Sequence, residues 1–425
     1  MNSPEDTLVL LLAGGVGSRL NILVNTRAKP AVPFAGLYRI IDFSLSNVMN
    51  SGMKHIGVLT QYKPLSLMRH LEAGEPWDFT GRSRGVKILP PSTGFKDSDW
   101  YKGTADAIRQ NLSFIKNHPS DEILILSGDH IYQMDLYAMI EFHRAKNADI
   151  TVGMMIVPKS QIHQFGTGIT NDEGRIVEWE EKPKVPRTNL ASMGIYVFNT
   201  EYLLNLLAED KDIVDFGIHL IPKAIVRDNV FAYPFEGYWR DVGTIQAYWE
   251  ANMDILKEDP EITPESWGIR PNPESERIFA DRIPARFAAD SKVCCSMISA
   301  GCVIEGEVVN SVLSPGVRVG PGCRINDSII LHDCVIEEGA TVDLAIMDKR
   351  VRIGKGAVVG SGDNRDIPNR KYPDHLYTGI SLIGKEADIP AGMIIGRNCI
   401  IEPWTRQQDF TAKVVSDGET VSSEE

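Results

Sequence analysis

The sequence predicts an α/β domain with a mostly parallel, mixed sheet, followed by a parallel β-helix. Three observations lead to this prediction. Short apolar runs alternate with segments of helical spacing through residues 8–250. The first of these runs, 8–12, ends abruptly in a glycine-rich loop. From about residue 291, an aliphatic residue recurs near every sixth position, with glycine and small residues between. Alternation of this kind is typical of βαβ units, and the six-residue period is typical of hexapeptide β-helices.

Length and charge limit the classes of protein to which the chain can belong. With 425 residues it should form two or three domains, which we place at 1–257 and 291–425, joined by a proline-punctuated linker at 258–290. The formal charge of −13 argues against a nucleic-acid partner. No apolar run approaches the roughly 20 residues of a membrane span, and the N-terminus resembles no signal peptide. We therefore expect a cytoplasmic protein without a membrane partner.

Three strands and two helices can be placed in the first domain by their hydrophobic spacing. The strands are expected at Ile56–Thr60, Ile123–Ser127 and Ile150–Met155, and the helices at Ala105–Ile115 and Leu136–Lys146. In open α/β sheets, ligands bind outside the carboxyl ends of the strands. The residues that follow each strand are therefore the first candidates for a functional site.

The loop after the first strand contains Gly14, Gly15 and Gly17, and Arg19 and Lys29 follow it. Glycine lets the backbone approach a ligand closely, and exposed N–H groups in such a loop bind anions. The two cations add positive charge where a polyphosphate would lie. The spacing matches neither the dinucleotide fingerprint nor the P-loop. The alternative is a structural strand-to-helix turn with a surface arginine.

Two aspartates occupy comparable positions later in the chain. Asp129 follows the strand at 123–127, and Asp241 precedes a glycine turn. Mg²⁺ on nucleotide phosphates typically takes one or two carboxylates together with phosphate oxygens, so this pair suits a magnesium site. Taken singly, Asp129 could instead cap the next helix, and Asp241 could be an ordinary turn residue.

The second half carries the hexapeptide period and all six cysteines. Each coil buries its aliphatic residues only by stacking on the next, so the open edges need a cap, either the first domain or another subunit. No cysteine pair has zinc spacing, and we expect all six to be small apolar core residues. The tail from about Gln407 is polar and acidic and is expected to be disordered. The aliphatic positions of the repeat include Ile298, Ile304, Val319, Ile325, Ile336 and Ile353.

With these motifs in order, the chain resembles the glucose-1-phosphate adenylyltransferase (ADP-glucose pyrophosphorylase) family, a branch of the sugar nucleotidyltransferases. The resemblance implies a Rossmann-like, GT-A-like catalytic domain, a left-handed β-helix and a homotetramer. Besides the glycine loop, it rests on the segments Arg27–Phe34, Tyr38–Phe43, Leu45–Asn47, Val58–Tyr62, Tyr101–Asp106, Ser127–Tyr132, Glu181–Pro183, Ala191–Tyr196 and Trp239–Thr244.

The implied reaction joins ATP and α-D-glucose 1-phosphate into ADP-glucose and pyrophosphate, supplying glycogen or a similar glucan. A sugar phosphate has a second pKa of about 6 and is mostly dianionic at neutral pH. Its oxygen is already a nucleophile, so positioning and charge neutralisation remain for the protein. A metal with Arg and Lys suits that task. The absence of a Ser-His-Asp or Cys-His motif agrees with this chemistry.

The resemblance also assigns roles to single residues. Arg19 and Lys29 would hold the triphosphate, Asp129 and Asp241 would bind Mg²⁺, and Lys182 would grip the sugar phosphate. Without the resemblance, Lys182 beside two glutamates would be interpreted as a solvated ion pair. The glucose 1-phosphate pocket would further include Tyr101, Gly166, Glu181 and Ser192, and the ATP site Gly14, Gly15, Gly17, Gln61, Gly103 and Thr104.

Two positions depart from the enteric members of the family. Thr26 stands where they have an activator-binding lysine, and Pro33 where they have a histidine, which counts against fructose 1,6-bisphosphate as the activator. Allosteric effectors of unknown identity are still expected between the two domains. Two alternatives stay open: a sugar-1-phosphate nucleotidyltransferase that uses UTP, dTTP or GTP, and a non-catalytic regulatory subunit. Acyl transfer by the β-helix would need a catalytic histidine, and neither His332 nor His375 lies in a motif for that chemistry, so a structural role is expected for both.

Overall fold

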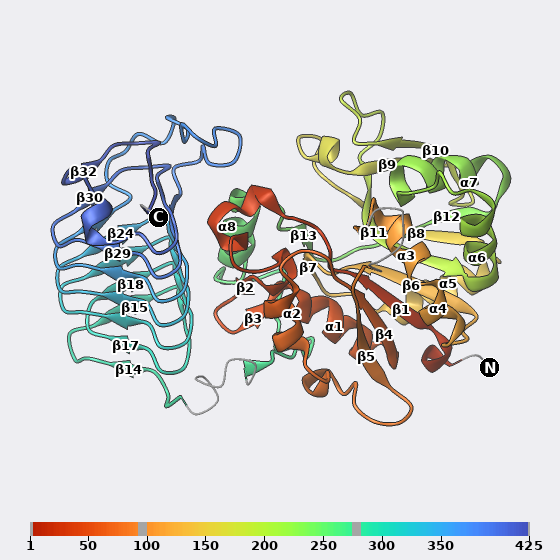
Figure 1. The fold of residues 1–425 in the computed structure, drawn as a ribbon, viewed down its shortest axis with the longest axis horizontal. Coiled ribbons are helices and arrows are strands. Elements are labelled where there is room, and N and C mark those ends of the chain that lie inside the picture. The colour runs from red at the N-terminus through yellow and green to blue at the C-terminus, as the bar shows by residue number, and fades with distance from the viewer. Residues whose placement is uncertain (1–2, 92–99, 274–281, 424–425) are drawn as a thin grey trace.

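The computed structural model describes residues 3–91, 100–273 and 282–423, and shows an α/β domain beside a β-helix (Figure 1). The α/β domain is built on one nine-stranded sheet. Its strands are β1 (Leu8–Leu12), β4 (His55–Leu59), β5 (Gly85–Leu89), β6 (Glu122–Ser127), β8 (Ile150–Ile156), β9 (Gly166–Thr170), β10 (Ile176–Glu181), β11 (Leu190–Asn199) and β12 (Val230–Pro234).

The sheet is mixed, as predicted. Strands β6, β1, β4 and β5 run parallel to one another. Strand β11 lies antiparallel between β6 and β8, so that β8 and its parallel partner β12 keep the direction of β1. Strand β9 also runs with β1, and β10 runs against it. The strands predicted at 56–60, 123–127 and 150–155 correspond to β4, β6 and β8 and are confirmed.

Helices pack on both faces of this sheet, because its strands are apolar on both sides. Successive residues of β1 alternate between two cores: Leu8 and Leu10 belong to one, and Val9 and Leu11 to the other. The helices are α1 (Ile40–Asn50), α2 (Pro64–Leu71), α3 (Thr104–Gln110), α4 (Leu112–Lys116), α5 (Leu136–Ala145), α6 (Thr200–Glu209), α7 (Ile221–Arg227) and α8 (Ile245–Asp254).

The helix predicted at 136–146 is confirmed as α5, whereas the single helix predicted at 105–115 is wrong. It is two short helices, α3 and α4, that meet at Asn111. The Asn111 amide donates to the carbonyl of Ala107 and to the hydroxyl of Tyr101, and the Asn111 N–H bonds to Ile108 rather than to Ala107. Asparagine competes for backbone groups in this way and interrupts the helix.

The β-helix is a stack of coils in which each full coil gives one short strand to each of three parallel sheets. The first sheet contains β14 (Arg286–Phe287), β17 (Val303–Ile304), β20 (Arg318–Val319), β23 (Val335–Ile336), β26 (Arg352–Ile353) and β29 (Asp388–Ile389). The second contains β15 (Lys292–Cys294), β18 (Glu307–Val309), β21 (Arg324–Asn326), β24 (Thr341–Asp343), β27 (Val358–Val359), β30 (Ile394–Ile395) and β32 (Val414–Val415). The third contains β16 (Met297–Ile298), β19 (Val312–Leu313), β22 (Ile329–Ile330), β25 (Ala345–Met347), β28 (Ser381–Ile383), β31 (Ile400–Ile401) and β33 (Thr420–Val421).

Two expectations for this half are wrong. The tail after Gln407 is not disordered as far as residue 423, because β32 pairs with β30 and β33 pairs with β31. Val415 continues the buried inner row of the coils, and one such residue per strand is enough to hold a polar segment in place. The cysteines also divide: four are buried core residues, but Cys294 and Cys295 are exposed.

The third sheet packs with its face against the α/β domain, a contact along the side of the β-helix rather than the predicted cap on the open edges of its outer coils. Phe34 and Tyr248 share one hydrophobic core with Val312, Ile346 and Ile400 of that sheet. In Figure 1, α8 lies on the side of the α/β domain that faces the β-helix, and its Trp249 indole donates to the Asp327 carbonyl at 2.7 Å.

The segment predicted as a linker, 258–290, includes residues 274–281, which lie outside the described residues. Its earlier part packs on the α/β domain: Ile262 and Ile269 are buried in the shared core, and the Arg270 carbonyl accepts a hydrogen bond from Trp77. Within the described ranges, none of the helices has the length and apolar character needed to cross a bilayer.

Candidate functional site

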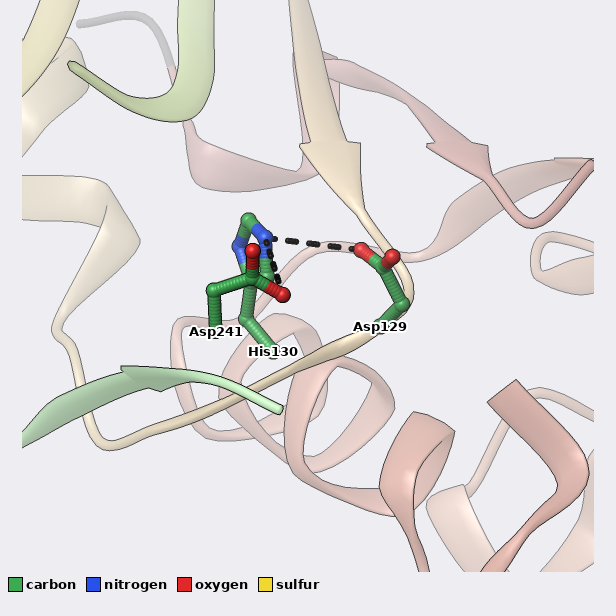
Figure 2. Close-up of side chains that lie close together, drawn as sticks. All are labelled: Asp129, His130 and Asp241. Atoms are coloured by element: carbon green, nitrogen blue, oxygen red, sulfur yellow. Dashed lines mark ion pairs between the residues drawn. The ribbon is translucent and has the colours of Figure 1, made fainter. Parts of the chain in front are cut away.

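The site lies at the carboxyl ends of β1 and β6, where the glycine loop and Asp129 emerge side by side. A small antiparallel pair brings Asp241 to the same place. Strands β7 (His130–Tyr132) and β13 (Trp239–Asp241) pair so that Asp241 stands opposite His130. Figure 2 shows Asp129, His130 and Asp241 pointing toward one another, with the His130 Nε2 3.5 Å from Asp129 Oδ1 and 3.9 Å from Asp241 Oδ1.

Lys29 lies between the two carboxylates. Its Nζ is 2.8 Å from Asp129 Oδ2 and 2.9 Å from Asp241 Oδ1, and the residue is only 5% exposed. Burial alone would lower the pKa of Lys29, but the two carboxylates outweigh it and raise that pKa above its usual value. Burial likewise opposes ionisation of both aspartates, yet Lys29 and His130 hold the pKa of each carboxyl below its usual range. The centre therefore carries fixed, opposite charges at neutral pH.

The same residues form a donor set for a metal ion. The ligand atoms of Asp129, His130 and Asp241 all lie within 4.8 Å of one another, and no other group of this kind occurs in the described part of the chain. The Ser127 hydroxyl donates to Asp129 Oδ1 and so orients that carboxylate. Two carboxylates and an imidazole fit a divalent cation.

The glycine loop borders a first cavity of about 290 Å³. A side chain added to Gly15 would meet nothing within 4 Å, which leaves its backbone open to a ligand. Gly17 has a φ of +64°, and an added Cβ would lie 2.9 Å from the Cβ of Lys29. Gly17 thus allows the close approach of loop and lysine rather than lining the cavity. The residues predicted for ATP that line this cavity are Gly14, Gly15, Gln61, Gly103 and Thr104.

Arg19 lines neither this cavity nor the next one. Its side chain is exposed and forms no ion pair with any described residue. Its guanidinium lies beside Gly243, because a Cβ added to Gly243 would come within 2.9 Å of Arg19 Nη2 and 3.0 Å of Asp241 Oδ1. The structure therefore places Arg19 at the rim, next to the turn that carries Asp241.

Three of the predicted nucleotide residues are held by contacts with residues outside that predicted set. The Thr104 hydroxyl donates to Asp215 Oδ2 at 3.1 Å, and the Gln61 Oε1 accepts from the Tyr101 N–H at 2.6 Å. Gly103 has a packing reason for being glycine, because a Cβ there would overlap the carbonyl of Val214.

A second cavity of about 230 Å³ adjoins the first and shares Leu12, Thr104, Ser127 and Asp215 with it. Four predicted sugar-phosphate residues line it: Gly166, Glu181, Lys182 and Ser192. The Glu181 carboxylate occupies the space that a side chain on Gly166 would need, since an added Cβ would lie 2.6 Å from Glu181 Oε2. Burial raises the pKa of Glu181, and Asp215 adds to the effect, although Lys182 opposes it. The Lys182 side chain is 64% exposed, with its Nζ 3.7 Å from Glu181 Oε1.

Tyr101 is separated from these four residues. It lines the first cavity, and its hydroxyl donates to the Leu89 carbonyl and accepts from Asn111, both at 3.0 Å. The predicted sugar-phosphate set is thus divided between the two cavities. The arrangement as a whole offers two adjoining ligand spaces with a carboxylate, lysine and imidazole centre where they meet.

Sequence reasoning missed three residues of the site. His130 directly follows Asp129, and Trp239 lies two positions before Asp241, so both stood within segments that had already been singled out. The indole ring of Trp239 packs edge-on against His130, with centroids 5.0 Å apart. Asp215 borders both cavities but carried no sequence signal, because only the folded chain brings it to Thr104.

Comparison with known proteins finds a matching family for each of the two parts of the chain. The family model "Nucleotidyl transferase" matches residues 8–258, and "GlmU-like, C-terminal hexapeptide" matches residues 283–383. The chain is 47% identical to the glucose-1-phosphate adenylyltransferase of Thermomicrobium roseum, 43% to that of Acetivibrio thermocellus and 42% to that of Thermotoga maritima. Each alignment covers 98% of this chain and 98% of the relative.

Proposed function

The chain belongs to the nucleotidyl transferases, within the glucose-1-phosphate adenylyltransferases, and from this premise we propose how its site works. It joins ATP to glucose 1-phosphate and releases pyrophosphate. The observation that carries the assignment of roles is the pair of adjoining cavities with Lys29, Asp129 and Asp241 where they meet. Two substrates held there would meet beside a fixed cluster of charges.

In the proposal, the first cavity takes ATP. The N–H groups of Gly14 and Gly15 face the phosphates, which suits an anion because no side chain intervenes. Lys29 and the rim residue Arg19 neutralise charge on the triphosphate and on the departing pyrophosphate. The buried position of Lys29 keeps its ammonium fixed in place, so little reorganisation is needed during transfer.

The second cavity takes glucose 1-phosphate. The exposed ammonium of Lys182 lies at its rim and can reach a phosphate, and Glu181 and Ser192 offer oxygen atoms to sugar hydroxyls. A dianionic phosphate oxygen attacks the α-phosphorus without help from a base. The residues therefore orient the two substrates in line and exclude water rather than move a proton.

Enzymes of this type use a divalent metal, and the donor set fits one. We propose that Asp129 and Asp241 hold it, with His130 beside them, and that it is Mg²⁺. When bound, such an ion polarises phosphoryl oxygens and neutralises their charge. Carboxylate oxygens are the ligands that Mg²⁺ prefers, and it keeps its other positions for water and phosphate.

Pyrophosphate release from a panel of nucleotides with glucose 1-phosphate tests the substrate assignment. We expect ATP to be used best, and a higher turnover with UTP, dTTP or GTP would overturn the adenylyl assignment. The role of Asp129 is tested by Asp129→Asn, which should lower kcat at least about a hundredfold. The matched control is Asp172→Asn, because Asp172 is exposed and lines neither cavity. A kcat for Asp129→Asn near that of the control would refute the role.

We also propose that anionic effectors bind between the two domains, where basic side chains gather. Burial holds the pKa of His332 well below its usual value, and the nearby charges of Lys349, Arg39, Arg282 and Arg27 add to the effect. Phosphate-bearing metabolites suit such a cluster. A panel of these metabolites on the purified enzyme, with Lys349→Ala beside it, tests the proposal through the effector response. The family resemblance predicts a homotetramer. Static light scattering tests this, and we expect a mass of four chains.

A further inference from the structure

The corner between β15 and β16, in the first coil of the β-helix, carries two adjacent cysteines. The sulfurs of Cys294 and Cys295 lie 3.2 Å apart, and both residues are exposed. We propose that they form a reactive vicinal dithiol, a modification site that a hydroperoxide converts into an intrachain disulfide and that a trivalent arsenical bridges. The other four cysteines are buried and do not compete for reagents: Cys302, Cys323, Cys334 and Cys399.

The backbone of this corner does not explain why cysteine stands there. Cys295 has a φ of +49°, and the same corner of the next three coils has Asn310 at +46°, Asp327 at +47° and Leu344 at +48°. This left-handed conformation favours glycine, asparagine and aspartate. Leu344 is buried in the shared core, whereas Cys295 is exposed. Neither backbone conformation nor packing therefore explains why position 295 is a cysteine. The remaining explanation is the chemical reactivity of its thiol.

Hydrogen bonds between coils hold the backbone around the pair. The Asn310 N–H donates to the Cys294 carbonyl at 3.1 Å, and the Ser296 hydroxyl donates to the same carbonyl at 2.8 Å. The Ser311 N–H in turn donates to the Ser296 hydroxyl at 3.1 Å. A disulfide needs its sulfurs about 2.05 Å apart, so closure from 3.2 Å requires a shift of about 1 Å. The fixed corner gives the two thiols a high effective concentration toward each other.

The pair divides its roles. The hydrogen bond with Cys294 and the charge on Cys294 raise the pKa of Cys295, so we assign the first attack to Cys294 and the second to Cys295. The Cys294 thiolate attacks a peroxide oxygen, the O–O bond breaks, and water leaves after taking up a proton, which makes a sulfenic acid. The Cys295 sulfur then attacks that sulfenic sulfur, the S–O bond breaks, and a second water leaves with the Cys295 proton. Two thiols lose two electrons, and hydrogen peroxide is reduced to two waters.

Thiol titration of the reduced, full-length protein gives the first test. We expect two of the six thiols to react about tenfold faster than the rest or more, because the buried thiols can react only after the protein opens locally. After treatment with hydrogen peroxide, the two fast thiols should disappear, and the chain mass should fall by two hydrogens. Peptide mapping should then find one peptide with both residues linked, and dithiothreitol should restore the fast thiols.

Single substitutions separate a dithiol from two independent thiols. Cys294→Ser and Cys295→Ser each keep one exposed thiol at a surface corner, so the fold is preserved while ring closure is impossible. Phenylarsine oxide should be retained through dialysis by the native chain and lost from both variants. Separate oxygen additions to each sulfur, covalent dimers, or equal retention of the arsenical by native and variant chains would overturn the proposal.

Discussion

Replacing Lys29 by methionine removes the cation that lies between Asp129 and Asp241. The lysine side chain is 6% exposed and holds both carboxylates at 2.8 and 2.9 Å. A divalent cation bound to the same oxygens would lie close to the Lys29 ammonium and would be repelled by it. We therefore expect two opposite results in Lys29→Met: tighter binding of a divalent cation in the absence of nucleotide, and slower turnover.

The size of the first effect follows from Coulomb's law. Two unit charges about 4 Å apart interact by about 1 kcal/mol in water. The Asp129 and Asp241 side chains are 28% and 20% exposed, so a water-like dielectric gives the conservative figure. Repulsion between Lys29 and a divalent ion is then about 2 kcal/mol, and its removal should tighten binding about 30-fold. Loss of one charge-stabilising group should lower kcat about a hundredfold or more.

Titration of Mn²⁺ by electron paramagnetic resonance, without nucleotide and at low salt, measures the first effect, and steady-state kinetics measures the second. The matched control is Lys116→Met, an exposed lysine at the end of α4. The reasoning is refuted if Lys29→Met binds Mn²⁺ no more tightly than the native chain. In that case the lysine and the cation do not share the two carboxylates.

Three further predictions concern other parts of the molecule. Lys182→Ala should raise the KM for glucose 1-phosphate more than it lowers kcat, whereas the exposed neighbour Lys184→Ala should leave KM unchanged; equal KM values in the two variants would count against the assignment. Burial and the adjacent Arg144 lower the pKa of His143 to about 4, so the folded state binds fewer protons than the unfolded state between about pH 6.5 and 4. Stability should therefore fall by up to about 3 kcal/mol as pH drops through that window, and His143→Gln, followed by thermal unfolding against pH, should remove this part of the loss. Arg27→Met strips the fully buried Asp348 of its cation at 2.9 Å and should destabilise the protein by about 3–5 kcal/mol; a melting temperature equal to that of the native chain would contradict this.

Local pattern was enough to predict the architecture. Runs such as Ile123–Leu126 are apolar on both faces, and a strand covered by helices on both sides requires this. The six-residue period predicts a coil because each coil must bury one aliphatic residue on each face. The glycine loop and the aspartates could be singled out because strand ends in such sheets lie at one edge.

Composition and spacing gave wrong predictions for two segments whose structure depends on a few residues. The polar tail after Gln407 forms one more partial coil, since Val415 supplies its buried inner position and Phe410 and Val421 pack against the same core. The helix at 105–115 breaks because the Asn111 side chain takes a carbonyl one turn back, an event that spacing does not reveal. Both differences come from a few side chains rather than from average properties.

By itself, the sequence determined which segments form strands, which loops follow them and which side chains those loops carry, because these properties depend on neighbours in the chain. Only the tertiary structure decided that Lys29 bonds to Asp129 and Asp241, which are 100 and 212 residues away in the sequence. Likewise, only the tertiary structure decided that Tyr101 lines the first cavity and that Asp215 lines both cavities. The pairing of β7 with β13 and the packing of the sheet set these distances, and such long-range contacts leave no local pattern to read.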